Sequence, residues 1–358
     1  MDEVEKSVES WQDRRKKIKH KWQTPFIFLE WNCERLSVLL KNWAFLEVLH
    51  YAGRLAIIIA VISYVWGYND RKNAKHYQAW QVINSAQGKK GSGGRMAALQ
   101  DLYRDGMSLA GLDISKANLP DLNLENANLS DANLSGANLP RAVLSMANLT
   151  NANIADANLA DAILPGAVLE RANLTQTWLF SANLAGAELT NSNLSGAMLE
   201  RANLAEAYLA GANLSEAMLT SANLSSADLV DANLFEARLA DANLVGAVLT
   251  RANFAEAYLA GANLTQARMI RANLSGAMLE GANLAGADLR EADLTNIMEW
   301  QSIKSIKYAN IYNVKNTPKG FKEWATARGQ DAVSIKSYEE WSKLISEKMA
   351  EATKKKKR

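Results

Sequence analysis

The sequence predicts a mainly β fold, a solenoid whose coils have four sides, with α-helical segments at both ends. Residues 109–294 carry an apolar residue at every fifth position, 38 times in succession, and all but four of these are leucine. From Asn173 to Asn283, every second residue before that leucine is asparagine. A long uncharged stretch, residues 55–69, predicts an apolar helix in the N-terminal part.

The five-residue period fits neither an α-helix nor a regular strand. Successive leucines would move around the axis of a helix, and a strand would turn alternate leucines to opposite faces. A small residue, nearly always alanine, lies two positions before each leucine, as in Ala127-Asn128-Leu129. Alanine and leucine therefore share one side of a short extended segment, and the remaining residues turn the chain. We expect a tube with both side chains inside.

The ten-residue rhythm of asparagine indicates the number of sides. Like residues stack only if a coil holds an even number of repeats, and four repeats of five residues place asparagine above asparagine on two opposite faces. Stacked amides can hydrogen-bond along the column, and asparagine tolerates turn conformations.

The A(N/D)LXX pattern of residues 107–296 closely resembles the pentapeptide-repeat family. This resemblance implies a right-handed quadrilateral β-helix in which the central Leu or Phe and the preceding Ala point inward. About nine and a half coils at ~4.8 Å each would give a rod roughly 45 Å long. Met107, Leu112 and Leu122 replace alanine at the start, which predicts contact with a cap.

Charge divides the chain into three parts. Residues 1–106 have a net charge of +6, residues 107–296 of −11 and residues 297–358 of +7. The single cysteine, Cys33, excludes an intrachain disulfide framework.

Residues 49–69 are predicted to form a transmembrane helix. The uncharged stretch is extended back past Arg54 to supply the length that a bilayer requires. Interfacial aromatic residues lie near its ends, among them Tyr51 and Trp66. A buried helix of a soluble domain is the alternative.

Residues 1–48 are predicted to form basic and amphipathic helices. Six of the eight residues at 14–21 are Lys or Arg and could lie against anionic lipid or form a solvated helix end. Charges near the span, with Arg71, Lys72 and Lys75 after it, favour a cytoplasmic rod, although the distal basic cluster favours the opposite orientation.

The segments flanking the repeats are predicted to be helical caps. Residues 70–106 contain a polar helix, a Gly-rich hinge at 88–94 and a cap helix, and residues 70–119 resemble the linker and cap of membrane-anchored cyanobacterial pentapeptide-repeat proteins. Residues 297–353 are predicted to form C-terminal cap helices, and residues 354–358 a disordered basic tail.

The sequence predicts neither catalysis nor a cofactor or metal site. The three histidines, His20, His50 and His76, lack metal-ligand spacing, and the motifs HExxH, CxxC and GxSxG are absent.

One exposed column is the predicted interaction face. Every twentieth residue from Trp178 is large and mostly apolar or amphipathic, a composition typical of interfaces. The column consists of Trp178, Met198, Met218, Arg238, Tyr258 and Met278. The alternative is that these side chains only cover backbone. The opposite column, from Glu188 to Asp288, is mixed and is expected to be solvated.

Two functions follow as hypotheses. The first is a non-catalytic, membrane-anchored scaffold that contacts the lipid bilayer through residues 49–69 and a protein partner, or a second copy of itself, through the rod. The second, implied by the resemblance, is an acidic rod that mimics DNA and binds a topoisomerase. Arginines in the same column as Asp231 argue against the second, and direct nucleic-acid binding is not favoured.

Overall fold

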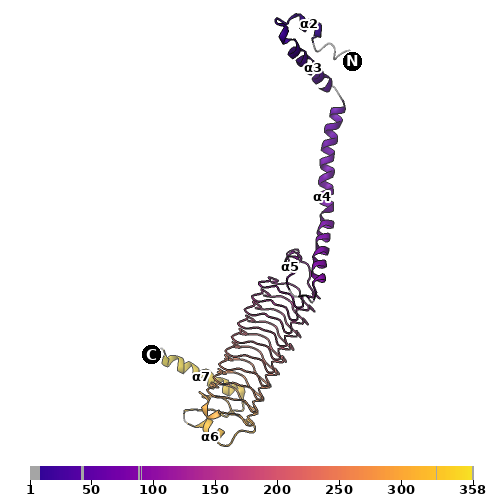
Figure 1. Cartoon of the computed structure of the whole chain (residues 1–358). Coiled ribbons are helices and arrows are strands. Elements are labelled where there is room, and N and C mark those ends of the chain that lie inside the picture. The colour runs from indigo at the N-terminus through magenta and orange to yellow at the C-terminus, as the bar shows by residue number, and fades with distance from the viewer. Residues whose placement is uncertain (1–8, 42–43, 88, 90, 328, 357–358) are drawn as a thin grey trace. The chain divides into compact units, whose positions relative to one another are not determined.

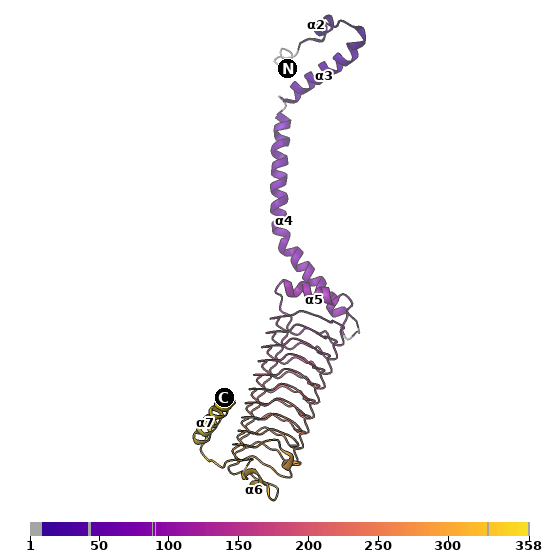
Figure 2. The same cartoon turned by 90° about the vertical axis from the view of Figure 1, so that its left-hand side faces the viewer.

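The computed structural model describes residues 9–41, 44–87, 89, 91–327 and 329–356. The chain divides into two compact units, Met1–Lys75 and His76–Arg358. The second unit contains the solenoid, a stack of coils that is seen from two sides in Figures 1 and 2.

Each coil contains twenty residues. Isolated parallel β-bridges join every residue that precedes a core apolar residue to the one twenty positions later, without interruption from Asp113–Asn133 to Met278–Met298. Backbone hydrogen bonds join the same coils, for example from Leu174 N–H to the Asn193 carbonyl at 2.7 Å. The prediction of four repeats per coil is therefore confirmed.

The corners of the coils depend on a left-handed residue. The second residue after each core apolar residue has a positive φ, as at Asp131 (59°), Arg251 (61°) and Gly276 (69°). The next alanine donates its N–H to the leucine carbonyl and closes the turn, at 3.1 Å from Ala132 to Leu129. This conformation is disfavoured for most L-residues by about 1 kcal/mol or more, so the stacked hydrogen bonds and the core must offset it in every repeat.

Leucine and alanine fill the interior of the tube, as the sequence predicts. Nearly all of them, and Phe254, are at most 2% exposed. Thr177 and Ser192 occupy alanine positions, and their buried hydroxyls donate to the carbonyls of Ile154 and Leu189 at 2.9 and 2.6 Å.

Two helical segments cover the first coil. Helix α5 (Arg95–Arg104) and the C-terminal end of helix α4 (Ala44–Ser85) contribute Leu99, Leu102 and Ile83 to the core. The described residues of the predicted flexible hinge at 88–94 contact the cap and the first coil. Gly91 forms a bridge to Ala117, and the buried Arg95 guanidinium donates to the carbonyls of Lys89 and Gly91.

The C-terminal end of the solenoid is irregular. The 3-10 helix η2 (Trp300–Ser302) lengthens the last coil, so that Asn283 pairs with Ser305. Helix α6 (Phe321–Thr326) then buries Phe321 in the core.

Helix α7 (Tyr338–Lys356) follows α6 and differs from the predicted cap and tail. It lies beside the last coils rather than across their end (Figure 2). It includes residues 354–356, which the sequence assigns to a disordered tail, because Ala, Glu and Lys favour helix. Residues 357–358 lie outside the described residues.

Most of the described residues of the first unit are helical. Helix α2 (Trp11–Lys16), the 3-10 helix η1 (Lys21–Gln23) and helix α3 (Thr24–Lys41) precede α4. The predicted transmembrane segment and the polar linker helix form one continuous helix, α4, which contains no proline.

Candidate interaction surface

The predicted column forms a continuous ridge on one side of the solenoid. Bridges join its members in succession from Trp178 to Met278, and one more joins Met278 to Met298. Each member is anchored by its own backbone, for example by a 2.9 Å hydrogen bond from Tyr258 N–H to the Ala237 carbonyl. We call these residues the 178–298 face: Trp178, Met198, Met218, Arg238, Tyr258, Met278 and Met298.

The 178–298 face begins abruptly. In the preceding coils the same column holds Asn118, Asn138 and Asn158, whose side chains hydrogen-bond to one another at 2.6 and 2.8 Å. At Trp178 this amide ladder gives way to large side chains. One column therefore carries a stabilising amide ladder in its first coils and large apolar or amphipathic side chains in the later ones.

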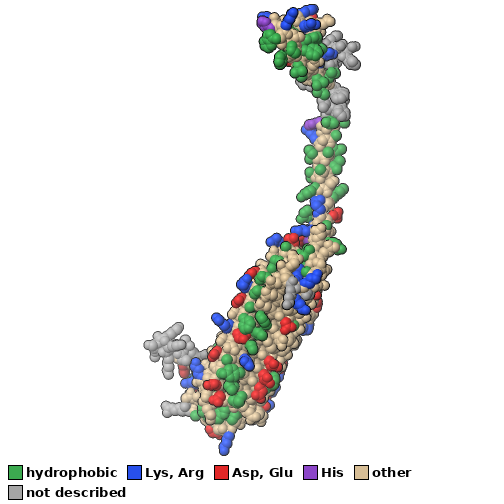
Figure 3. Space-filling model, viewed as in Figure 1, with side chains coloured by type: hydrophobic (Ala, Val, Ile, Leu, Met, Phe, Trp, Pro, Cys, Tyr) green, Lys and Arg blue, Asp and Glu red, His purple; other side chains and the backbone are tan. Residues whose placement is uncertain are grey.

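Exposure differs along the face. Trp178, Tyr258 and Met298 are 46%, 40% and 43% exposed, whereas the three other methionines are half-buried. The aromatic rings are therefore available to a partner, and the inner methionines also cover backbone. Figure 3 shows hydrophobic and charged side chains interspersed along the solenoid.

Acidic corners border the face. Glu216, Glu236 and Glu256 are exposed and occupy the same corner in three successive coils, two residues before members of the face. On the other border lies Phe180, two residues after Trp178 and 36% exposed. Neither feature lies in a column before a leucine, so the ten-residue rhythm of those columns does not reveal them. Met298 lies one coil beyond Met278, so the twenty-residue period of the sequence identifies it.

Asparagine ladders occupy the two neighbouring faces. One runs from Asn183 to Asn243 with amide–carbonyl distances of 2.9–3.0 Å. The other runs from Asn213 to Asn273 with distances of 2.9–3.0 Å. Most of these asparagines also accept a backbone N–H two residues later, as Asn233 does from Phe235 at 3.3 Å. The side-chain amides of these two faces therefore form hydrogen bonds within the solenoid.

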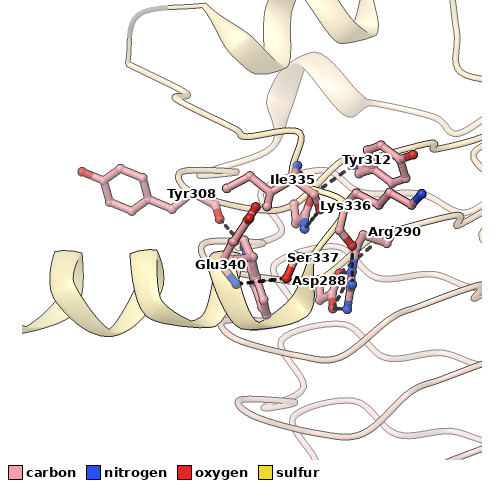
Figure 4. A network of polar contacts seen from close by, with 10 residues as sticks. Asp288, Arg290, Tyr308, Tyr312, Ile335, Lys336, Ser337 and Glu340 are labelled. Atoms are coloured by element: carbon pink, nitrogen blue, oxygen red, sulfur yellow. Dashed lines mark hydrogen bonds and ion pairs between the residues drawn. The ribbon is translucent and has the colours of Figure 1, made fainter.

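The fourth face is occupied at its end by the chain itself. Asp288 is fully buried and binds Arg290 through two oxygens, at 2.7 and 2.8 Å (Figure 4). Arg290 also donates to the Lys336 carbonyl at 3.0 Å. The expectation of a solvated column is therefore wrong at Asp288, because residues returning from the C-terminal segment cover it.

A second set of contacts fixes the same segment. The buried Asn310 side chain donates to the Ile335 carbonyl at 2.7 Å and accepts its N–H at 3.0 Å. Trp341 Nε1 donates to the Tyr308 carbonyl at 3.2 Å, and Ile345 packs against Gly286. Helix α7 thus docks beside the fourth face, opposite the 178–298 face.

Arginines neutralise several exposed acidic corners one coil away. Arg141 binds Asp121 at 2.7 Å, and Arg271 binds Glu291 at 2.8 Å. These hydrogen bonds hold the carboxyl pKa values below their usual ranges. Such pairs contribute stability above the ordinary carboxyl pKa and lose it as the pH falls through the lowered one. Asp231 is paired with Arg251 in the same way.

Titratable side chains outside the repeat columns are the remaining candidates for a clustered site. The described residues contain no group of three or more His, Cys, Asp or Glu side chains that could hold a metal ion. His76 is buried and pairs with Asp105 at 2.6 Å. In an open groove of about 520 Å³ beside the N-terminal cap, the Ser108 hydroxyl accepts from Asn128 at 3.1 Å and contacts no described base.

The repeat itself decides the family. The family model described as pentapeptide repeats matches in eight copies over residues 108–177 and 179–296, more than half of the chain. The chain belongs to the pentapeptide-repeat family. Its fold is accordingly a right-handed β-helix, and the twenty-residue coils give that helix four sides.

Two solved pentapeptide-repeat structures illustrate the similarity. HetL from the cyanobacterium Nostoc sp. strain PCC 7120, involved in heterocyst differentiation regulation, is 35% identical. That match covers 56% of this chain and 94% of HetL, with a TM-score of 0.29. QnrB1, a plasmid-mediated fluoroquinolone resistance protein, is 16% identical over 65% of this chain and 97% of its own, with a TM-score of 0.29. The comparison with curated proteins gives no match.

Proposed function

We propose that this pentapeptide-repeat protein is a non-catalytic scaffold, anchored in a membrane by residues 49–69 of α4 and presenting the 178–298 face to a protein partner. The observation that carries the proposal is one exposed ridge of aromatic and methionine side chains on a solenoid whose neighbouring faces are closed by asparagine ladders.

The apolar part of α4 supports the anchor. A stretch within Val48–Ser85 is long and apolar enough to cross a membrane, and none of its most apolar window is buried. Ile57, Ile58 and Ile59 are 66%, 53% and 54% exposed and, as successive residues of a helix, point to different sides of it. A helix that is apolar all round requires an apolar environment, and the described residues supply none for it.

The borders of the face indicate the chemistry of the partner. Aromatic and methionine side chains fit an apolar surface, and the row of Glu216, Glu236 and Glu256 favours basic residues at its rim. We therefore expect a partner with an apolar centre and a basic edge. If the face binds a second copy of the chain, Arg238 would supply the basic group that contacts the glutamate row of that copy.

Two measurements test the proposal. If α4 spans the membrane, we expect the full chain to resist extraction from membranes by alkaline carbonate. A triple variant, Met198→Ser, Met218→Ser and Met278→Ser, should lose its co-purifying partner or change its oligomeric state in light scattering. The matched control changes the fourth face instead: Glu188→Ser, Tyr208→Ser and Val248→Ser. Equal behaviour of the two variants and the wild type would contradict the proposed surface.

Sidedness has its own test. We propose a cytoplasmic solenoid because Arg71, Lys72 and Lys75 follow the span. Protease should then digest the solenoid in inside-out vesicles and leave it intact in right-side-out vesicles; the reverse pattern would invert the topology.

The DNA-mimic alternative receives little support. Arginines interrupt the acidic corners, and the glutamate row extends over three coils only. A gyrase supercoiling assay should therefore show no effect of the solenoid, and inhibition would favour the alternative.

A further inference from the structure

Helix α3 carries two apolar stripes on different sides. The first consists of the half-buried apolar residues at 27, 31 and 38, and the half-buried Glu34 lies on the same face. Helix α2 covers this stripe. The ring centroid of Trp11 lies 4.8 Å from that of Phe28 and 5.7 Å from that of Trp31. Arg14 binds Glu34 through two hydrogen bonds of 2.7 and 2.9 Å.

The second stripe is uncovered. Phe26, Leu29 and Leu36 are 69%, 67% and 58% exposed, and Cys33 and Leu40 are exposed among them. Trp22, in η1 at the start of the helix, is 70% exposed. We call these residues the bare stripe: Trp22, Phe26, Leu29, Cys33, Leu36 and Leu40.

The uncharged arc around the bare stripe is wide. With 3.6 residues per turn, successive residues of α3 lie about 100° apart around the helix axis. The sector that starts at Phe28, passes Leu39 and the bare stripe and ends at Phe26 covers about 160° of the helix circumference. It contains no charged residue. A seam that contacts one other helix is narrower, whereas a broad apolar face with Trp, Phe and Leu is typical of a helix lying in a membrane interface.

The surroundings of the bare stripe favour the same partner. Six Lys and Arg residues fall within 14–21, at the C-terminal end of α2 and in the segment that leads from it to α3, with no acidic residue among them. Only residues 42 and 43 separate α3 from α4, the proposed membrane span. A basic cluster and an apolar stripe on one hairpin match the headgroups and acyl boundary of an anionic bilayer.

We propose that the α2–α3 hairpin lies on the surface of an anionic lipid bilayer, with the bare stripe of α3 inserted at the acyl boundary and the 14–21 cluster at the headgroups. This inference rests on the proposed span and adds a second, lipid-selective membrane contact. It applies to either orientation of the span.

The native chain contains a single cysteine in the bare stripe, which provides a probe. The full-length protein is placed in nanodiscs, so that both membrane surfaces are accessible, with or without anionic phosphatidylglycerol. In nanodiscs with anionic lipid, Cys33 should react with a polar maleimide about tenfold more slowly than a control thiol on the other side of α3, measured in the same nanodiscs. That control carries Cys33→Ser and Arg35→Cys, because Arg35 is exposed and lies two residues away.

Charge selectivity is tested separately. The variant Lys16→Gln, Lys19→Gln and Lys21→Gln should lose most of the protection that anionic lipid gives to Cys33. The control variant Lys304→Gln, Lys319→Gln and Lys322→Gln removes equal charge from exposed C-terminal positions and should retain it.

Several results would overturn the inference. Equal reactivity of the two thiols would show that the bare stripe faces water, and a Cys33–Cys33 crosslink between chains would assign it to a second copy. Protection that is the same in neutral lipid would remove the role of the basic cluster. Carbonate extraction distinguishes the two proposals: an extractable chain contradicts the span, whereas a resistant chain with a reactive Cys33 contradicts only the hairpin placement.

Discussion

At the scale of single residues, burial decides what an ion pair contributes. Asp288 and Asp231 each bind an arginine at short range. Asp288 is fully buried beneath the C-terminal segment, whereas the Asp231 side chain is 50% exposed. Water and salt screen the exposed pair, so it stabilises the fold little. Removing one partner of a buried pair leaves an uncompensated charge.

The variant Asp288→Ala should therefore lower the free energy of unfolding by about 3 kcal/mol. Arg290 would lose its partner, and its hydrogen bond to the Lys336 carbonyl would weaken. Urea denaturation measures the loss, and hydrogen exchange should increase around Ile335. Asp231→Ala is the control and should leave the denaturation midpoint almost unchanged; equal effects of the two variants would argue against a buried pair at Asp288.

At the scale of elements, the coils are held together by ladders as well as by the core. Asn233 donates to Asn213 at 3.0 Å, accepts from Asn253 at 2.9 Å and accepts the Phe235 N–H at 3.3 Å. It therefore joins three coils and fixes one corner. The residues of the 178–298 face lack these bonds, and only their backbones hold them.

Replacing Asn233 by alanine should lower the free energy of unfolding by about 1–3 kcal/mol, because two neighbouring amides lose a partner in a half-buried position. Thermal denaturation followed by circular dichroism is the measurement. Glu188→Ala changes an exposed residue at the equivalent place in a repeat and should have little effect. A loss of similar size there would mean that the ladder contributes nothing specific.

At the scale of the whole molecule, the twenty-residue coil is the unit of register. A solenoid buries its core between neighbouring coils, so a coil can be removed without exposing the interior. Removing any multiple of five residues preserves the inward leucines. Only a multiple of twenty preserves all four outer columns.

Deletion of residues 203–222 should therefore give a folded protein that retains both asparagine ladders. Deletion of residues 203–207 removes less of the chain but places Tyr208 over Asn183 and Met218 over Asn193. We expect this shorter deletion to have the lower melting temperature and to interrupt the 178–298 face after Met198, with loss of partner binding. A lower melting temperature for the full-coil deletion would contradict the assigned register.

The repeat region could be predicted almost completely because its information is local. Every fifth leucine defines the core, and the alternation that gives Asn183 and Asn203 the same column defines four sides. The structure adds that a left-handed residue turns every corner. The 178–298 face was also readable from the sequence, except for Met298, Phe180 and the glutamate corners.

The sequence by itself determined the solenoid, its register and the apolar helix, because each depends on contacts between residues at a fixed spacing. Only the tertiary structure decided how the ends are closed. Arg95 fixes the glycine segment through backbone carbonyls, and Asp288 is buried by residues about fifty positions later. Those contacts join segments without any periodic relation, so no pattern in the sequence could reveal them. They leave the 178–298 face uncovered and occupy the C-terminal end of the opposite face.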